Sequence, residues 1–135
     1  MQIEKKTPTV LCVDDQQMDR QLLHDLFQTN NFDVLTAENW PDAKILLNSN
    51  EVDVVILDYR LIQANAVDIA IEVRKSRPRV PIMLLSGFLA DVPEYFKRAV
   101  DGCVSKSSPL ADWVDTAKSL CNSGEGTSSG RARAI

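Results

Sequence analysis

The chain has 135 residues, of which 44% are hydrophobic and 25% are charged, and its formal net charge is −4. A chain of this length and balance buries a core without disulfides or metal staples, so we expect one globular domain. The acidic balance and the lack of a long basic run exclude a nucleic-acid-binding domain. The apolar runs are too short to span a bilayer, and no secretory signal pattern opens the sequence.

The cysteines are odd in number and far apart, and they form no CxxC pair: Cys12, Cys103 and Cys121. His24 is the single histidine, so no cluster of histidine and cysteine suits zinc. Buried thiols of this kind are typical of a reducing compartment, and we expect a cytoplasmic protein.

The first third of the chain alternates between two periodicities. After a polar lead-in, residues 1–8, the apolar run 9–13 predicts a buried strand. Residues 16–30 predict a helix whose inward face carries Met18, Leu22, Leu23, Leu26 and Phe27. A short strand over 32–36 follows. Asn39, with Pro41 just after it, predicts the start of a helix that ends near 48–50.

The run 52–58 predicts the central strand, because it is rich in Val, Ile and Leu and ends abruptly on Asp58. A loop is expected over 59–65. The next helix directs inward the residues Val67, Ile69, Ala70, Ile71 and Val73.

The last part repeats the alternation. A strand over 82–85 ends on Ser86, and residues 91–100 predict a short helix that carries Tyr95, Phe96 and Ala99. A brief strand, 103–104, ends at Lys106, and an amphipathic helix follows over 110–121. We expect residues 9–121 to form the domain and residues 122–135 to form a flexible Ser/Gly-rich tail.

A strand followed by a helix therefore occurs five times, which predicts an α/β, doubly wound fold: a parallel sheet with helices on both faces. The carboxyl ends of parallel strands share one edge of the sheet. The polar residues that follow the strands should therefore meet there: Asp14, Asp15, Asp58, Ser86 and Lys106.

Such an edge has a definite chemistry. Clustered carboxylates repel one another unless a cation lies among them, and oxygen ligands suit Mg²⁺ or Mn²⁺. Lys106 and Ser86 suit a phosphoryl group on Asp58. Each residue alone is compatible with a turn, a helix cap or a solvated surface. Their placement at successive strand ends favours the functional interpretation.

With these residues the sequence resembles the receiver domains of two-component response regulators, over about residues 8–121. The motifs that carry the resemblance are Val13-Asp14-Asp15, Leu57-Asp58, Leu85-Ser86 and Lys106. The resemblance implies a flavodoxin-like (βα)5 fold with strand order 2-1-3-4-5. It also implies that Asp58 accepts the phosphoryl group while Ser86 and Lys106 sense it.

The resemblance further implies a metal site and partners. Mg²⁺ would be bound by Asp15, Asp58 and the backbone carbonyl of Arg60, with Asp14 acting through water. A histidine kinase or a histidine phosphotransfer protein would phosphorylate Asp58. The state would be read by a docking partner or a C-terminal output domain. The chain would not be a turnover enzyme on an external substrate.

The sequence departs from the family pattern at four positions. Ile62 and Ala66 stand where the family usually has Pro and Gly, and Ser107 follows the lysine where Pro is usual, so a trans bond is expected. Cys103 replaces the switch aromatic. These departures favour an alternative function, a receiver-like interaction module that acts without phosphorylation. A haloacid-dehalogenase-type phosphatase is disfavoured, because Arg60 occupies the position of its second acid.

The usual family interface implies a homodimer through the fourth helix, the fifth strand and the fifth helix. Tyr95, Cys103 and Trp113 belong to those elements. We expect Trp113 to pack in the core rather than on that surface.

Overall fold

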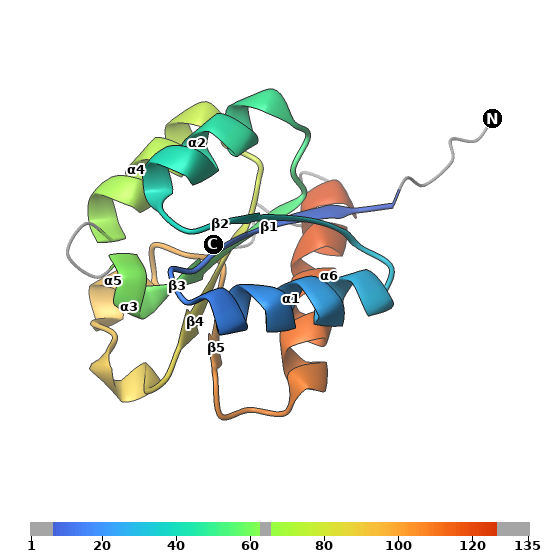
Figure 1. The fold of residues 1–135 in the computed structure, drawn as a ribbon. Helices are drawn as coiled ribbons and strands as arrows, with labels where there is room; N and C mark the ends of the chain where they lie inside the picture. Colours follow the sequence, from blue (N-terminus) through green and yellow to red (C-terminus); the bar gives the residue numbers. More distant parts are fainter. Residues whose placement is uncertain (1–6, 63–65, 127–135) are drawn as a thin grey trace.

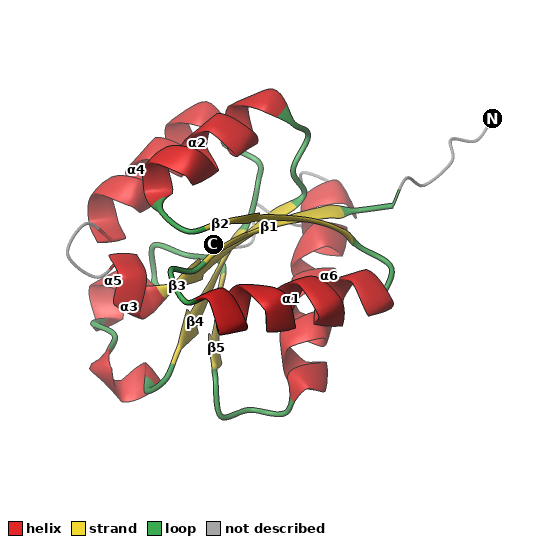
Figure 2. Ribbon diagram, viewed as in Figure 1, coloured by secondary structure: helices red, strands yellow, loops and turns green. Residues whose placement is uncertain are grey.

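Strands and helices alternate along the chain in the computed structural model, which describes residues 7–62 and 66–126 (Figure 1, Figure 2). The strands are β1 (Thr9–Val13), β2 (Asp33–Ala37), β3 (Val54–Asp58), β4 (Ile82–Ser86) and β5 (Gly102–Ser105). The longer helices are α1 (Gln17–Thr29), α2 (Trp40–Ser49), α4 (Ala66–Ser76) and α6 (Leu110–Gly126). Three short helical segments are α3 (Tyr59–Ile62), η2 (Leu89–Asp91) and α5 (Glu94–Lys97).

The strands form one sheet of order β2-β1-β3-β4-β5, and all neighbouring strands are parallel. This is the predicted doubly wound fold of the flavodoxin-like type, with the predicted strand order. The chain leaves β1 toward β2 on one side and returns to β3 on the other. Ligands of such sheets collect where the order reverses, outside the carboxyl ends of the strands.

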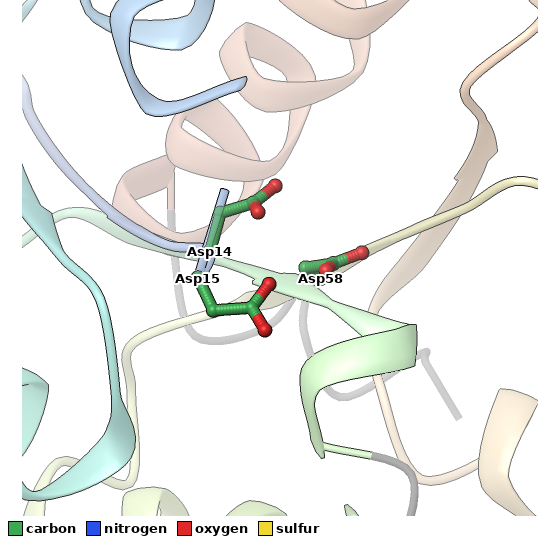
Figure 3. A group of neighbouring side chains, drawn as sticks. All are labelled: Asp14, Asp15 and Asp58. Carbon is green, nitrogen blue, oxygen red and sulfur yellow. The ribbon is translucent and has the colours of Figure 1, made fainter. Parts of the chain in front are cut away.

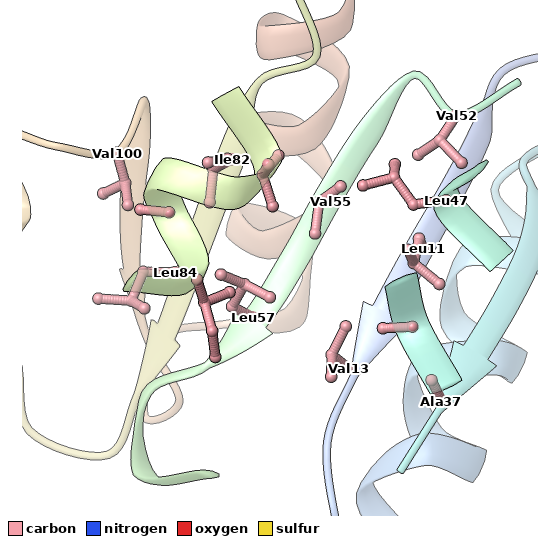
Figure 4. Close-up of a cluster of buried hydrophobic side chains, with 14 of the residues drawn as sticks. Leu11, Val13, Ala37, Leu47, Val52, Val55, Leu57, Ile82, Leu84 and Val100 are labelled. Carbon is pink, nitrogen blue, oxygen red and sulfur yellow. The ribbon is translucent and has the colours of Figure 1, made fainter. Parts of the chain in front are cut away.

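Both faces of the sheet are covered by helices (Figure 1). Consecutive strand residues alternate between two apolar clusters, because side chains alternate across a strand. Leu11, Val55 and Leu84 pack with residues of α2 and α4 on one face (Figure 4). The other face, against α1 and α6, buries Val10, Cys12, Val54, Ile56, Met83, Leu23, Phe27 and Trp113. Burial on both faces explains why the strands are continuous apolar runs.

The helix ends follow local chemistry. Asn39 caps α2, since its Oδ1 accepts a hydrogen bond from the Asp42 backbone N–H at 2.8 Å. Helix α1 ends at Thr29, and Asn31, two residues later, has φ of 71°, a conformation that asparagine tolerates better than most residues. The Phe32 N–H then bonds the Phe27 carbonyl at 3.0 Å and closes the helix end. The start of α2 at Asn39 was predicted from the sequence.

The prediction of inward-facing residues is only partly confirmed. On α1, Leu23 and Phe27 are buried, but Met18 is 83% exposed and Leu22 is also exposed. The buried stripe is set by positions four residues apart, and residue 18 lies well around the helix from that stripe. On α4, Ile69, Ala70 and Val73 are buried as expected, whereas Ile71 faces solvent. The side chain of Val67 lies outside the described part.

The predicted helix over 91–100 is wrong in length. The segment divides into η2 and α5, which is a single turn from Glu94 to Lys97. Pro93 is the reason, because it lacks an N–H and forces the preceding Val92 into an extended conformation, with φ of −87° and ψ of 123°. Phe96 is buried, while Tyr95 and Ala99 are exposed.

Two further expectations need correction. The loop predicted over 59–65 begins as the short helix α3, and residues 63–65 lie outside the described residues. Helix α6 continues to Gly126, so residues 122–126 are helical where we expected tail, and residues 127–135 are not described. Across the described ranges, no helix has the length and apolarity that a membrane crossing needs.

Candidate phosphoryl-acceptor and metal site

The register of the sheet brings the predicted carboxylates together. Val13 pairs with Leu57, so Asp14 and Asp58, the next residues on each strand, lie side by side at the edge. Their side chains are almost fully buried, whereas Asp15 is exposed. Carboxylate oxygens of Asp14, Asp15 and Asp58 all lie within 4.8 Å of one another, and Figure 3 shows the three side chains gathered at the strand ends.

The backbone around Asp14 is held on several sides. Its N–H donates to the Ala37 carbonyl at 3.0 Å, and its own carbonyl accepts from Arg20 Nη1 at 3.0 Å. The Asp14 Oδ1 accepts from the Gln16 N–H at 2.9 Å. Burial raises the pKa of Asp14; the bond from Gln16 opposes this shift, and the neighbouring charge of Asp58 adds to it. The carboxylate is therefore held in a fixed position, and the charge of Lys106 only partly offsets the effect of burial on its pKa.

Lys106 is the cation of the cluster. Its Nζ lies 3.1 Å from Asp58 Oδ1, 3.5 Å from Asp14 Oδ2 and 3.2 Å from Asp19 Oδ2. Burial by itself would lower the pKa of Lys106. The attraction of Asp58, Asp14 and Asp19 outweighs that effect and raises the pKa, so the side chain is held as an ammonium.

The remaining oxygens of the cluster suit a hard divalent cation. In the described part of the chain, Asp14 Oδ2 and Asp58 Oδ2 are buried and accept no hydrogen bond. Buried carboxylate oxygens without donors are costly unless a cation meets them. The donor set contains only oxygen, which favours Mg²⁺ or Mn²⁺ over zinc. The residues present therefore fit the predicted metal.

Ser86 ends strand β4 at the same edge of the sheet. It is buried, and its Oγ donates to the Phe88 carbonyl at 3.0 Å. The Lys106 N–H donates to the Ser86 carbonyl at 2.8 Å, which fixes the end of β4 beside the lysine. Because its acceptor is a nearby backbone carbonyl, the Ser86 hydroxyl can exchange this hydrogen bond for one to a new acceptor.

The other predicted site residues have different outcomes. Arg60 lies on α3, two residues after Asp58, and its side chain is exposed. That its backbone carbonyl binds the metal stays a prediction. Cys103 is half-buried against the apolar cluster beside α5, and Trp113 is buried as expected. The described chain holds no cis peptide bond, so the bond after Lys106 is trans as predicted.

Sequence reasoning missed two residues of α1 that reach the site, Asp19 and Arg20. Asp19 binds Lys106, and Arg20 binds the Asp14 carbonyl and lies 3.7 Å from Glu38. The available signal was position alone: a helix that begins directly after an acidic strand end presents its first turn to that edge. Nothing in the residue types distinguishes Asp19 from a helix-start acid, which is common for electrostatic reasons.

A sequence model of the response regulator receiver domain matches residues 10–118, which is most of the chain and all of its sheet except Thr9. The chain belongs to the response regulator receiver domain family. The match spans every motif on which the resemblance was based, from the Asp14-Asp15 pair to Lys106.

Curated relatives of this receiver domain are of different kinds. It is 28% identical over 131 residues to the autoinducer 1 sensor kinase/phosphatase LuxN of Vibrio campbellii, covering 90% of this chain but 15% of that protein. It is 28% identical over 97 residues to the two-component response regulator ORR13 of Oryza sativa subsp. japonica, covering 71% of this chain and 80% of that protein. The chain thus spans a small part of LuxN and most of ORR13.

Solved structures are similar to this chain in both fold and sequence. The response regulator TrrA of Thermotoga maritima, solved in complex with Mg²⁺-BeF, is 29% identical, with a TM-score of 0.75 over 84% of this chain and 98% of that chain. A structure of the histidine kinase ThkA in complex with TrrA matches at 29% identity and a TM-score of 0.74, covering 84% of this chain and 97% of that chain.

Proposed function

We propose that this receiver domain accepts a phosphoryl group on Asp58 in a Mg²⁺-dependent reaction with a histidine kinase or a histidine phosphotransfer protein. The observation that carries the proposal is the asymmetry of the Asp58 carboxylate. One oxygen, Oδ1, is held by Lys106 at 3.1 Å, while the buried Oδ2 accepts no hydrogen bond from the described residues. Asp58 is thus oriented by one oxygen and has the other available for reaction.

The reaction needs few groups from the protein. An oxygen of Asp58 attacks the phosphorus of phosphohistidine, the P–O bond forms, and the P–N bond breaks with its electron pair left on the imidazole. The product is an acyl phosphate. Lys106 supplies a positive charge for the phosphoryl oxygens, and Ser86 supplies a hydroxyl donor once it leaves the Phe88 carbonyl.

Asp15, Asp58 and the Arg60 carbonyl are proposed to bind the metal directly, and Asp14 to bind it through water. When bound, Mg²⁺ neutralises the charge of the two anionic reactants and orients the phosphoryl group. The buried oxygens of Asp14 and Asp58 that accept no hydrogen bond from the described residues support this assignment, because both residues belong to the cluster of three carboxylates.

We propose that the chain is not a turnover enzyme. It modifies itself and later loses the phosphoryl group to water. The partners we propose are a kinase or phosphotransfer protein upstream and a docking protein or output domain downstream. ThkA, bound to the similar TrrA, is a histidine kinase and supports the upstream partner by analogy. Cytoplasmic localisation is proposed from the family and from cysteine usage.

A homodimer through α5, β5 and α6 also stays a proposal. Tyr95 on α5 is 64% exposed and suits such a contact, whereas Trp113 is buried in the core and does not. With Cys103 in place of an aromatic, signal transfer to that face needs a route other than a ring that swings inward.

The decisive experiment is intact-mass measurement after incubation with acetyl phosphate, with and without Mg²⁺, beside Asp58→Asn. A matched control is Asp53→Asn, which removes an exposed carboxylate directly before the start of the same strand. We expect a Mg²⁺-dependent phosphoryl adduct in the wild type and in the control, and none in Asp58→Asn. A folded wild type that binds Mg²⁺ and forms no adduct would instead support a phosphate-independent docking module.

A further inference from the structure

Lys106 has one partner that the phosphoryl chemistry does not require. Its Nζ is shared between Asp58, whose side chain is 2% exposed, and Asp19, whose side chain is 40% exposed. The Asp19 contact, at 3.2 Å, is nearly as short as the Asp58 contact, at 3.1 Å, and joins residues 87 positions apart in sequence. The lysine therefore bridges strand β5 and the first turn of helix α1.

Asp19 is not one of the three carboxylates that come within 4.8 Å of one another. Its side chain is partly exposed, whereas the side chains of Asp14 and Asp58 are almost fully buried. A carboxylate in this place attracts the ammonium away from Asp58. It therefore opposes the movement of Lys106 toward a phosphoryl group on Asp58.

We infer that Asp19 is a positioning residue that competes with the phosphoryl group for Lys106 and so slows phosphoryl uptake. The inference rests on the proposed function. Before phosphorylation, Asp19 and Asp58 share the ammonium. As charge builds on the oxygens around Asp58, Lys106 turns fully to them, and its pair with Asp19 is lost. Because Asp19 is half exposed, water solvates the released carboxylate and the exchange costs little.

The test compares single-variant rates of phosphoryl uptake from acetyl phosphate at saturating Mg²⁺, followed by intact mass. Asp19→Asn keeps an oxygen that accepts a hydrogen bond from Lys106 but removes the charge. We expect its uptake rate to rise by about threefold, in line with a partly exposed ion pair. Removing an acid weakens the attraction for a divalent cation, so a faster rate cannot come from tighter metal binding.

Asp25→Asn is the matched control. It removes the same charge from the same helix, and its carboxylate contacts Gln21 and His24 rather than Lys106. Its rate should equal that of the wild type. Asp19→Glu, which restores the charge, should bring the rate back toward that of the wild type. Thermal unfolding of each variant confirms that the proteins compared are folded.

A variant without the Lys106 charge distinguishes competition for Lys106 from simple repulsion between Asp19 and the phosphoryl donor. In Lys106→Gln protein, whose uptake is followed over a longer time if it is slower, adding Asp19→Asn should leave the rate unchanged. A rise of equal size in that background, a rate for Asp19→Asn equal to that of Asp25→Asn, or a slower rate would each overturn the inference. If the wild type forms no phosphoryl adduct in the first measurement, that result contradicts the proposed function itself rather than this inference.

Discussion

Asp14 is held in a fixed position by hydrogen bonds, but that position buries its negative charge. Its backbone and one carboxylate oxygen are fixed by hydrogen bonds, yet the other oxygen is buried without a donor among the described residues. Burial is the main reason that the pKa of Asp14 is raised. A folded-state pKa above the unfolded value means that ionised Asp14 costs stability in the absence of a cation.

We therefore predict that Asp14→Asn is more stable than the wild type at pH 7 in Mg²⁺-free buffer, because the amide removes the cost of the buried charge. With a raised folded pKa, the native state binds more protons than the unfolded state, so wild-type stability falls as pH rises through that window. The difference between the proteins should shrink as pH falls through the carboxyl range. Urea unfolding between pH 4 and pH 7 measures it.

The control for this prediction is Asp115→Asn, an exposed acid on α6. Its stability should follow that of the wild type at every pH. An Asp14→Asn protein that is less stable at pH 7 would show that the pair with Lys106 outweighs the cost of burial.

At the scale of elements, local signals fixed most boundaries. The caps of α1 and α2 and the ends of the strands lie within two residues of their predicted places. The failures have a local cause that was visible in the sequence, as at Pro93, or a geometric one, as at Met18. The spacing of apolar residues indicates that a helix has an inward face. A small rotation of the helix about its axis decides whether a residue at the border of that face is buried or exposed.

The cap of α2 offers a test at this scale. Asn39→Ala removes the acceptor of the Asp42 N–H and should lower the free energy of unfolding by about 1 kcal/mol. Asn48→Ala, at an exposed position in the same helix, should change it little. Phosphoryl uptake should be unaffected in both, because α2 supplies none of the clustered acids. Equal stabilities of the two variants would show that the cap contributes nothing.

At the scale of the whole molecule, the site exists only because the sheet assembles. Asp14, Asp58 and Lys106 are brought together by the pairing of β1 with β3 and by the return of β5 beside β4. Any cation bound there stabilises the folded state over the unfolded one, since the unfolded chain has no such cluster.

We predict that Mg²⁺ raises the melting temperature, with a stabilisation of about 2.7 kcal/mol at one hundred times its dissociation constant. Asp15→Asn should lose most of this response while staying folded, because Asp15 is exposed. Asp115→Asn, measured at the same ionic strength, should keep the full response. A response that all three proteins share would indicate general screening by salt rather than a site.

The sequence by itself determined the order of strands and helices, the parallel sheet and the identity of the acids at its edge. These follow from local periodicity and from the rule that parallel strands share one carboxyl edge. Only the tertiary structure decided which oxygens lack donors, that Ser86 turns to Phe88, and that Asp19 shares Lys106. Those facts depend on distances between residues far apart in the chain, which no local pattern contains.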